Sequence, residues 1–329
     1  MLLRILKSNS LFSPLLIPVI GVLFWMQSFQ SPGLIDINLT NGAMPLYNLF
    51  YRLFKELGFW QVFFAFILVL ANSFFISQLG SNFLFQRNRS YLPGIIYLIT
   101  VSSITRLHLL LPAHFAALFV LISIYFIFDT YHKPNEITFT FNASFFLSIA
   151  SLFYLPSVIL FPLVWIAIFV LQKSDNWRLL VIPVLGFSIP WIFLWTYSFL
   201  TDSTAVLWKE LVIMLWDYHN SYLFEPYFWL LSAVVSLAAI LGSFSIISVY
   251  HRIKVSSRKY FVIFYWMLGI LLASGLGLIT IGIEIVALST IPLAYFVTQF
   301  LVMGHKSIWK EAVMWFYVAI MVFSIYFYK

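Results

Sequence analysis

The chain has no cysteine and very little charge. The absence of cysteine excludes a disulfide framework, a thiolate nucleophile and a cysteine-based metal site. Charged residues make up only 9% of the 329 residues, whereas soluble domains carry about 25%. No polar stretch is long enough to build a soluble domain, so we interpret residues 1–329 as a single membrane domain. Walker A, Rossmann glycine, HExxH and GxSxG motifs are also lacking, which argues against ATP-driven transport, nucleotide-cofactor chemistry and common hydrolase mechanisms.

Apolar and aromatic residues dominate what is present. The chain is 63% hydrophobic and 20% aromatic, with a mean hydropathy of +0.99. Lipid must therefore be the solvent for most of the surface, with Trp and Tyr at the interfaces. The first apolar run follows Arg4 and Lys7 in the manner of a signal peptide, but it ends in Phe24-Trp25-Met26-Gln27 without a small-residue cleavage site. We expect an uncleaved first span.

Short polar stretches divide the chain into about eleven apolar segments. The expected fold class is an all-α, polytopic transmembrane helix bundle. Several segments hold only 14–17 residues, fewer than the roughly 20 that cross a full hydrocarbon core. Segments 141–154 and 157–172 meet around Pro156, so one broken helix is an alternative there. The expected spans are 11–27, 58–79, 91–105, 112–128, 141–154, 157–172, 179–200, 227–250, 260–274, 278–302 and 309–327.

The distribution of basic residues favours a cytoplasmic N-terminus and an extracytoplasmic C-terminus in the cytoplasmic (inner) membrane. With eleven spans, thirteen of the 18 Lys and Arg residues fall on the cytoplasmic side, and five fall outside. The same bias explains the net charge of +7 better than nucleic-acid binding does, because no basic run lies on a soluble module. The five outside are Arg52, Lys55, Arg106, Lys209 and Lys329.

Two expected external segments are long. Within Ser28–Gly58, the part from Pro45 has apolar residues at helical spacing, which predicts a short amphipathic helix along the membrane surface. The segment Thr201–Pro226 is acidic and rich in Trp and Tyr. Carboxylates beside aromatic rings suit sugar recognition, although interfacial aromatics give the same pattern without a ligand. The candidate binding residues of this segment are Asp217, His219 and Glu225.

The first external segment also holds a candidate for chemistry. Asp36 suits a general base or a ligand of a divalent cation, or else it is a turn residue among Gly33, Asn38 and Asn41-Gly42. Any metal requirement stays open.

Arg106 is expected at the external end of the third span. It offers a donor fork for phosphate, or else it snorkels to the interface. His108 and His114 lack the i, i+4 spacing of a helical metal pair, so structural histidines at the interface are favoured over ligands. Glu284 is expected two turns inside the span 278–302, either as a proton or ion site or as a protonated, hydrogen-bonded group.

The order of these features resembles the integral-membrane (GT-C) glycosyltransferases. An acidic first external loop is followed by PLYNLFYRLF, a span, and the basic turn Phe85-Gln-Arg-Asn-Arg89. The stretch 278–302, with STIPLAYFV, is similar to the late helix of that family, and the chain also resembles an uncharacterised bacterial membrane family. Two departures are Asn38, where a second acid often stands, and the absence of an arginine before the late helix.

The resemblance implies transfer of a sugar from a polyprenyl-phosphate donor on the extracytoplasmic side, with Asp36 in the catalytic role. Arg106 and Arg52 would hold the phosphate, and the acidic segment would shape the acceptor side. The alternatives are a non-catalytic multi-pass subunit or assembly factor, and a transporter or flippase, for which no internal repeat is present. The expected partners are membrane lipids and a polyprenyl-phosphate sugar donor, nucleic acid is not expected, and protein partners stay unknown. The residues expected to bind substrate are Arg52, Arg106, His108, His114, Asp217, His219 and Glu225.

Overall fold

The structure is a computed structural model, and it describes residues 13–32, 44–54, 57–83, 90–131, 136–171, 177–216, 226–248, 253–274, 284–302 and 308–327. These ranges contain thirteen α-helices and two short 3-10 helices, η2 and η3, and no β-strand. The all-helical class expected from the sequence is confirmed for them. The α-helices are α2 (Ser13–Gln30), α3 (Pro45–Phe54), α4 (Gly58–Asn82), α5 (Leu92–Ser102), α6 (Pro112–Asp129), α7 (Glu136–Phe153), α8 (Phe161–Leu171), α9 (Arg178–Leu200), α10 (Thr204–Trp216), α11 (Pro226–Ser248), α12 (Val255–Ala273), α13 (Ile285–Val302) and α14 (Ile308–Phe327).

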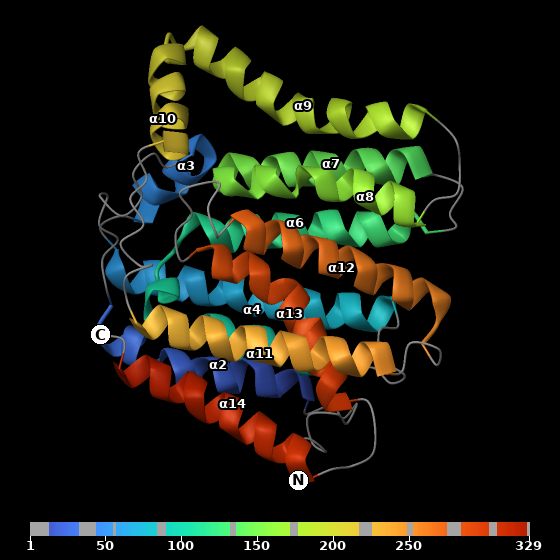
Figure 1. Cartoon of the computed structure of the whole chain (residues 1–329). Coiled ribbons are helices and arrows are strands. Elements are labelled where there is room, and N and C mark those ends of the chain that lie inside the picture. Colours follow the sequence, from blue (N-terminus) through green and yellow to red (C-terminus); the bar gives the residue numbers. More distant parts are fainter. Residues whose placement is uncertain are drawn as a thin grey trace.

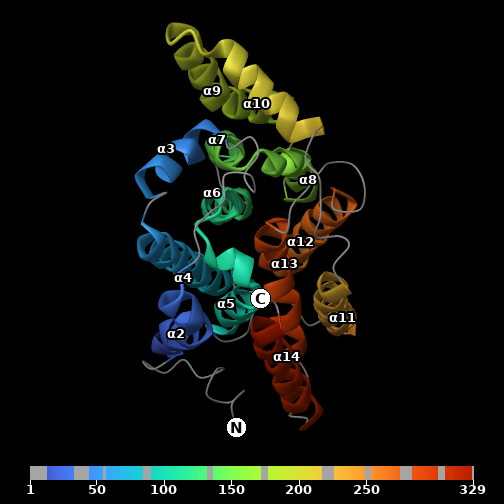
Figure 2. The same ribbon diagram turned by 90° about the vertical axis from the view of Figure 1, so that its left-hand side faces the viewer.

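The long helices lie side by side with their axes roughly aligned, and α3 lies at one end of the bundle (Figure 1). We call this the α3 end; it faces the viewer in Figure 2. Among the described residues, six helices are long and apolar enough to cross a membrane. They are α4, α6, α7, α9, α12 and α13.

Close helix packing depends on small residues. A Cβ atom built at Gly94 of α5 would lie 2.2 Å from the backbone oxygen of Ser73 in α4. A Cβ atom at Gly186 of α9 would lie 2.2 Å from Oγ of Ser144 in α7. Because lipid offers no hydrophobic force between helices, such backbone approach supplies the packing contacts instead.

Polar side chains also join neighbouring helices. The hydroxyl of Ser148 in α7 donates to the carbonyl of Phe187 in α9 at 2.7 Å. The hydroxyl of Tyr295 in α13 donates to the carbonyl of Ile76 in α4 at 2.6 Å. These bonds connect segments that are far apart in the sequence, so they fix the neighbours of each helix in the bundle.

Segments 141–154 and 157–172 are two helices as expected, and not one broken helix, because α7 and α8 lie side by side after a reversal at η3 (Leu155–Leu160) (Figure 1). Two other local features differ from the expectation. Helix α10 occupies much of the acidic segment 201–226, where no helix was predicted. The late helix begins at Ile285 rather than near 278, so Glu284 lies just before it rather than two turns inside.

Candidate functional site

Helix α3 confirms the amphipathic helix expected from Pro45 onward. Phe50 packs on Phe115 of α6, with the ring centroids 4.9 Å apart, and Tyr47 is fully buried. The hydroxyl of Tyr47 donates to the carbonyl of Leu110, at 2.7 Å. Leu49 and Leu53 are exposed on the outer side. The helix therefore has one side fixed to the bundle and an apolar side left for lipid.

Gln61 of α4 fixes the other end of α3. Its amide nitrogen donates to the carbonyl of Phe54, the last residue of the helix, at 2.7 Å. The final carbonyls of a helix have no partner within it, and this one accepts from Gln61 and also from the amide of Leu57, at 3.0 Å. Tyr47 and Gln61 together hold the short helix against the α3 end.

Glu284 lies just before α13 and interacts electrostatically with Tyr47. It is 9% exposed, and its backbone carbonyl accepts a bond from the amide of Ala287, at 3.1 Å, in the first turn of α13. Burial raises the pKa of the Glu284 carboxyl to about 8. Burial, and second the nearby Glu284 charge, raise the pKa of Tyr47 as well. A carboxyl and a phenol from opposite ends of the sequence thus share one buried environment.

The 3-10 helix η2 (Thr105–His108), between α5 and α6, carries His108. Its Nε2 lies 2.9 Å from the carbonyl of Ser102, and its Nδ1 lies 2.6 Å from the hydroxyl of Ser28 in α2. Because a carbonyl only accepts, Nε2 carries the proton and the Ser28 hydroxyl donates to Nδ1. Burial lowers the pKa of His108 to about 4. The imidazole is therefore neutral and uses both nitrogens in structural bonds.

Trp25 completes this arrangement. Its ring stacks on the His108 ring with the centroids 4.2 Å apart, and its Nε1 donates to the hydroxyl of Ser102 at 2.7 Å. Sequence reasoning did not find Trp25, Ser28 or Tyr47. A serine and two aromatic residues near helix ends are common in membrane proteins, so no sequence signal marked them.

His114, in the first turn of α6, is also fully buried. Its Nε2 donates to the carbonyl of Leu107 at 2.8 Å, and its backbone carbonyl accepts from the amide of Asn72 at 3.2 Å. The two histidines are consistent with the structural alternative. No group of three or more metal-ligating side chains occurs within the described ranges.

The two predicted phosphate-binding arginines both belong to elements at the α3 end. Arg52 is exposed on α3, and Arg106 is half-buried on η2. Arg52 lies near Glu210 of α10; burial raises the pKa of Glu210, and the Arg52 charge opposes that rise. The α3 end therefore combines two guanidinium groups with two carboxyl groups.

Four predicted site residues lie outside the described residues. Asp36 falls between α2 and α3 in the sequence, and Asp217, His219 and Glu225 fall between α10 and α11. Their predicted roles stay predictions.

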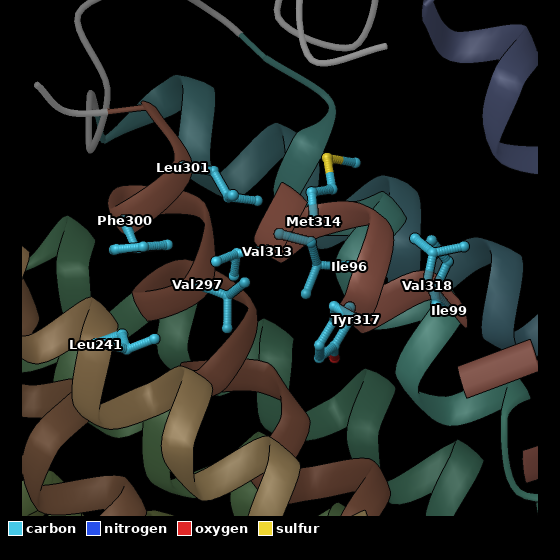
Figure 3. A pocket seen from close by; sticks show the side chains of 10 residues that line it. All are labelled: Ile96, Ile99, Leu241, Val297, Phe300, Leu301, Val313, Met314, Tyr317 and Val318. Atoms are coloured by element: carbon cyan, nitrogen blue, oxygen red, sulfur yellow. The ribbon is translucent and has the colours of Figure 1, made fainter. Parts of the chain in front are cut away.

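A crevice of about 30 Å³ lies between α5, α11, α13 and α14 (Figure 3). Its lining is apolar apart from Tyr317, whose hydroxyl is hydrogen-bonded to Thr100 of α5. This crevice offers no free polar group for chemistry.

Comparison with family models, with curated proteins and with solved structures finds no match for the chain.

Proposed function

We propose that the chain crosses the cytoplasmic membrane eleven times, with the α3 end outside. The described basic residues support this topology. Helices α9, α12 and α14 begin at the end opposite α3 (Figure 1), and each carries Lys or Arg in its first turn or two. The sequence-based topology assigned those residues to the cytoplasm, and it assigned Arg52 and Arg106 to the outside.

At the outer face, we propose transfer of a sugar from a polyprenyl-phosphate donor to an acceptor. The observation that carries the proposal is the attachment of α3, through Tyr47, to the chain between η2 and α6. This contact joins the amphipathic helix of the first external segment to the segment that bears Arg106. A lipid-linked sugar phosphate lies at the membrane surface, where an amphipathic helix and guanidinium groups meet its lipid and its anion.

The residues take separate roles in this proposal. Arg106, with Arg52, binds the phosphate of the donor, because a guanidinium forms paired bonds to phosphate oxygens. Asp36 acts as the base toward the acceptor hydroxyl or as a ligand of a divalent cation. Asp217, His219 and Glu225 contribute to the acceptor side. Interactions with the developing phosphate charge would account for most of the rate increase.

The test is sugar transfer by the purified protein in liposomes that contain a radiolabelled polyprenyl-phosphate sugar. Asp36→Asn is expected to abolish transfer. Glu136→Gln at the start of α7, at the opposite end, is the matched control and should leave transfer unchanged. Equal transfer by wild type and Asp36→Asn would remove Asp36 from the mechanism.

Arg106→Ala separates phosphate binding from a structural role. We expect a higher KM for the donor at an unchanged amount of folded protein. Arg106→Lys keeps the charge but loses the planar donor fork, so it should recover only part of the affinity. Loss of folded protein without a change in KM would indicate that Arg106 serves only to anchor η2.

The second candidate is a non-catalytic membrane subunit. It is favoured by His108 and His114, which are both committed to hydrogen bonds inside the bundle. Mass spectrometry of cell-envelope glycans with and without the protein decides between the two. A lost glycan that Asp36→Asn fails to restore supports the transferase, whereas full restoration by Asp36→Asn supports the subunit.

A further inference from the structure

We propose that the crevice between α5, α11, α13 and α14 binds one acyl chain of an anionic phospholipid, with the headgroup at Lys310. The proposal does not rest on the transferase function, because it concerns the end of the bundle opposite α3. Helix α14 begins at that end (Figure 1), and its first turns carry both a cation and one wall of the crevice. An apolar space beside a cation matches the two parts of a lipid.

The crevice has a buried floor and a rim at the surface of the bundle. On the floor, Ile96 is 3% exposed and Met314 is 5% exposed. On the rim, Leu241 of α11 and Val313 and Val318 of α14 are half-buried (Figure 3). The crevice is therefore open to the surrounding lipid between α11 and α14.

The lining excludes water as the occupant. Every lining residue except Tyr317 is apolar, and the Tyr317 hydroxyl is already hydrogen-bonded to Thr100. A bound water needs several polar partners, so an apolar space of this kind stays dry. The volume of about 30 Å³ has room for about two or three groups of water size. A section of one acyl chain fits there and supplies the contacts that the wall atoms would otherwise lose.

Close packing of α11 on α13 bounds the crevice on one side. A Cβ atom built at Gly242 of α11 would lie 2.4 Å from the backbone oxygen of Phe296 in α13. The next residues in the two helices, Leu241 and Val297, both line the crevice. The two backbones thus meet beside the crevice, and an acyl chain is kept on the α14 side of their contact.

Lys310 lies at the centre of the face of α14 that lines the crevice. Val313, Met314 and Tyr317 follow it by three, four and seven residues, and this spacing places side chains on one face of a helix. The Nζ atom of Lys310 lies 5.7 Å from the centroid of the Phe300 ring. That ring lines the crevice from the side of α13, so the cation lies beside the apolar wall.

The position of Lys310 along α14 suits a lipid headgroup. The neighbouring Trp309 is 80% exposed, and tryptophans gather where the hydrocarbon meets the headgroups. Tyr317 lies about 10 Å further along the helix axis, from the rise of an α-helix per residue. The crevice therefore extends from the level of the headgroups into the hydrocarbon.

The charge of Lys310 favours an anionic headgroup over a zwitterionic one. An ammonium group attracts a phosphate as a point charge, whereas a zwitterionic headgroup brings a second cation close to it. Glu311 lies about a quarter-turn around the helix from Lys310, so it flanks the crevice face. In the proposed topology this end is cytoplasmic, and anionic lipids are abundant in the cytoplasmic leaflet.

Native mass spectrometry of the full-length protein tests the headgroup, with phosphatidylglycerol and phosphatidylcholine of identical acyl chains as probes. We expect wild type to retain one phosphatidylglycerol about fivefold more tightly, the factor that one lysine contributes near a membrane surface. Lys310→Gln should lose this preference, and Lys310→Arg should keep it. Lys254→Gln is the matched control, because Lys254 is exposed just before α12 at the same end. Equal retention of the two lipids by wild type, or an equal loss of preference in both Gln variants, would overturn the proposal.

Val313→Phe tests the acyl chain, because the added ring fills the crevice from its rim. We expect it to lose the retained phosphatidylglycerol at unchanged helix content by circular dichroism, and Leu241→Phe should do the same from α11. Ala312→Phe places a ring on an exposed position of α14 and should keep the lipid. Unchanged retention in both crevice variants would overturn the proposal. Tighter retention of a polyprenyl phosphate than of phosphatidylglycerol by wild type would also overturn it, by assigning the crevice to an isoprenoid chain.

Discussion

Helices α5 and α9 are both apolar by sequence, but they occupy opposite environments in the molecule. Every residue of α5 is buried, whereas most residues of α9 are exposed or half-buried. Helix α5 contacts α2, α4, α13 and α14, while α9 mainly contacts α7 along one side. The hydropathy of a helix indicates that it avoids water, but it does not show whether lipid or other helices surround it. The two helices differ in whether other helices surround them or cover one side only.

The largest expected effect comes from removing an aromatic ring that packs against α5, compared with removing an exposed ring of α9. Trp25→Ala removes a fully buried ring that contacts α5 through Ser102 and stacks on His108. We expect a loss of about 3–5 kcal/mol. Phe193→Ala on α9 removes a ring that is 71% exposed, so little change is expected. Thermal unfolding in detergent measures both, and equal losses would contradict the contrast between the helices.

Glycine substitutions sharpen the comparison. Gly94→Ala forces a methyl group against the α4 backbone, and we expect a loss of about 1–3 kcal/mol. Gly186→Ala should cost a similar amount, because the inner side of α9 is packed as closely as α5 is. Gly269→Ala in α12 meets nothing within 4 Å, so it is the control and should be neutral or slightly stabilising. A tolerant Gly186 would mean that α9 is held loosely on both sides.

Acidification should act on the surroundings of α5, since α9 contains no histidine. Burial lowers the pKa of His108 from 6.5 to about 4, so the unfolded chain binds the proton more strongly. The free energy of unfolding is therefore unaffected by His108 above about pH 6.5, and it is lower by about 2 kcal/mol at about pH 5. His108→Asn should roughly halve the dependence of the unfolding temperature on pH between these values, because burial also lowers the pKa of His114 to about 4 and its contribution remains. An unchanged slope would show that other groups cause the acid sensitivity.

The smallest expected effect comes from a pair of threonines. Thr100 of α5 bonds its own helix at Ile96 and also the Tyr317 hydroxyl of α14. Thr196 of α9 bonds only the carbonyl of Ile192 in its own helix. Thr100→Val should lose about 0.6 kcal/mol, the average for such bonds within membranes. Thr196→Val should lose almost nothing, and a larger loss there would place an unexpected partner on the lipid-facing side of α9.

Much of the fold is readable from the sequence, because lipid imposes long apolar helices and water imposes amphipathic ones. The expected span 58–79 corresponds to α4, and the pattern from Pro45 onward corresponds to α3. Helix α10 was missed because the charges of segment 201–226 concealed the apolar run in TAVLWKELVIMLW. The expected span 278–302 followed from an external turn placed at Gly275–Gly277. That position put Glu284 two turns inside the helix, whereas the helix begins at Ile285.

The candidate site was less readable than the fold. The two arginines were placed at the external end by the charge bias, and they belong to elements at the α3 end. The electrostatic interaction between Tyr47 and Glu284 joins residues more than two hundred positions apart, and no local pattern encodes it. The spacing of His108 and His114 already favoured structural roles over metal binding, but their burial and their hydrogen-bond partners became visible only in three dimensions.

The contacts between α5 and α14 have a consequence for biosynthesis. The hydrogen bonds of Thr100 to Tyr317 and of Ser103 to Ser324 can form only after the ribosome has added more than two hundred further residues. Until then, these polar groups at α5 lack their partners in α14. Helix α14 covers this side of α5, so a chain truncated before α14 would expose these polar groups to membrane proteases.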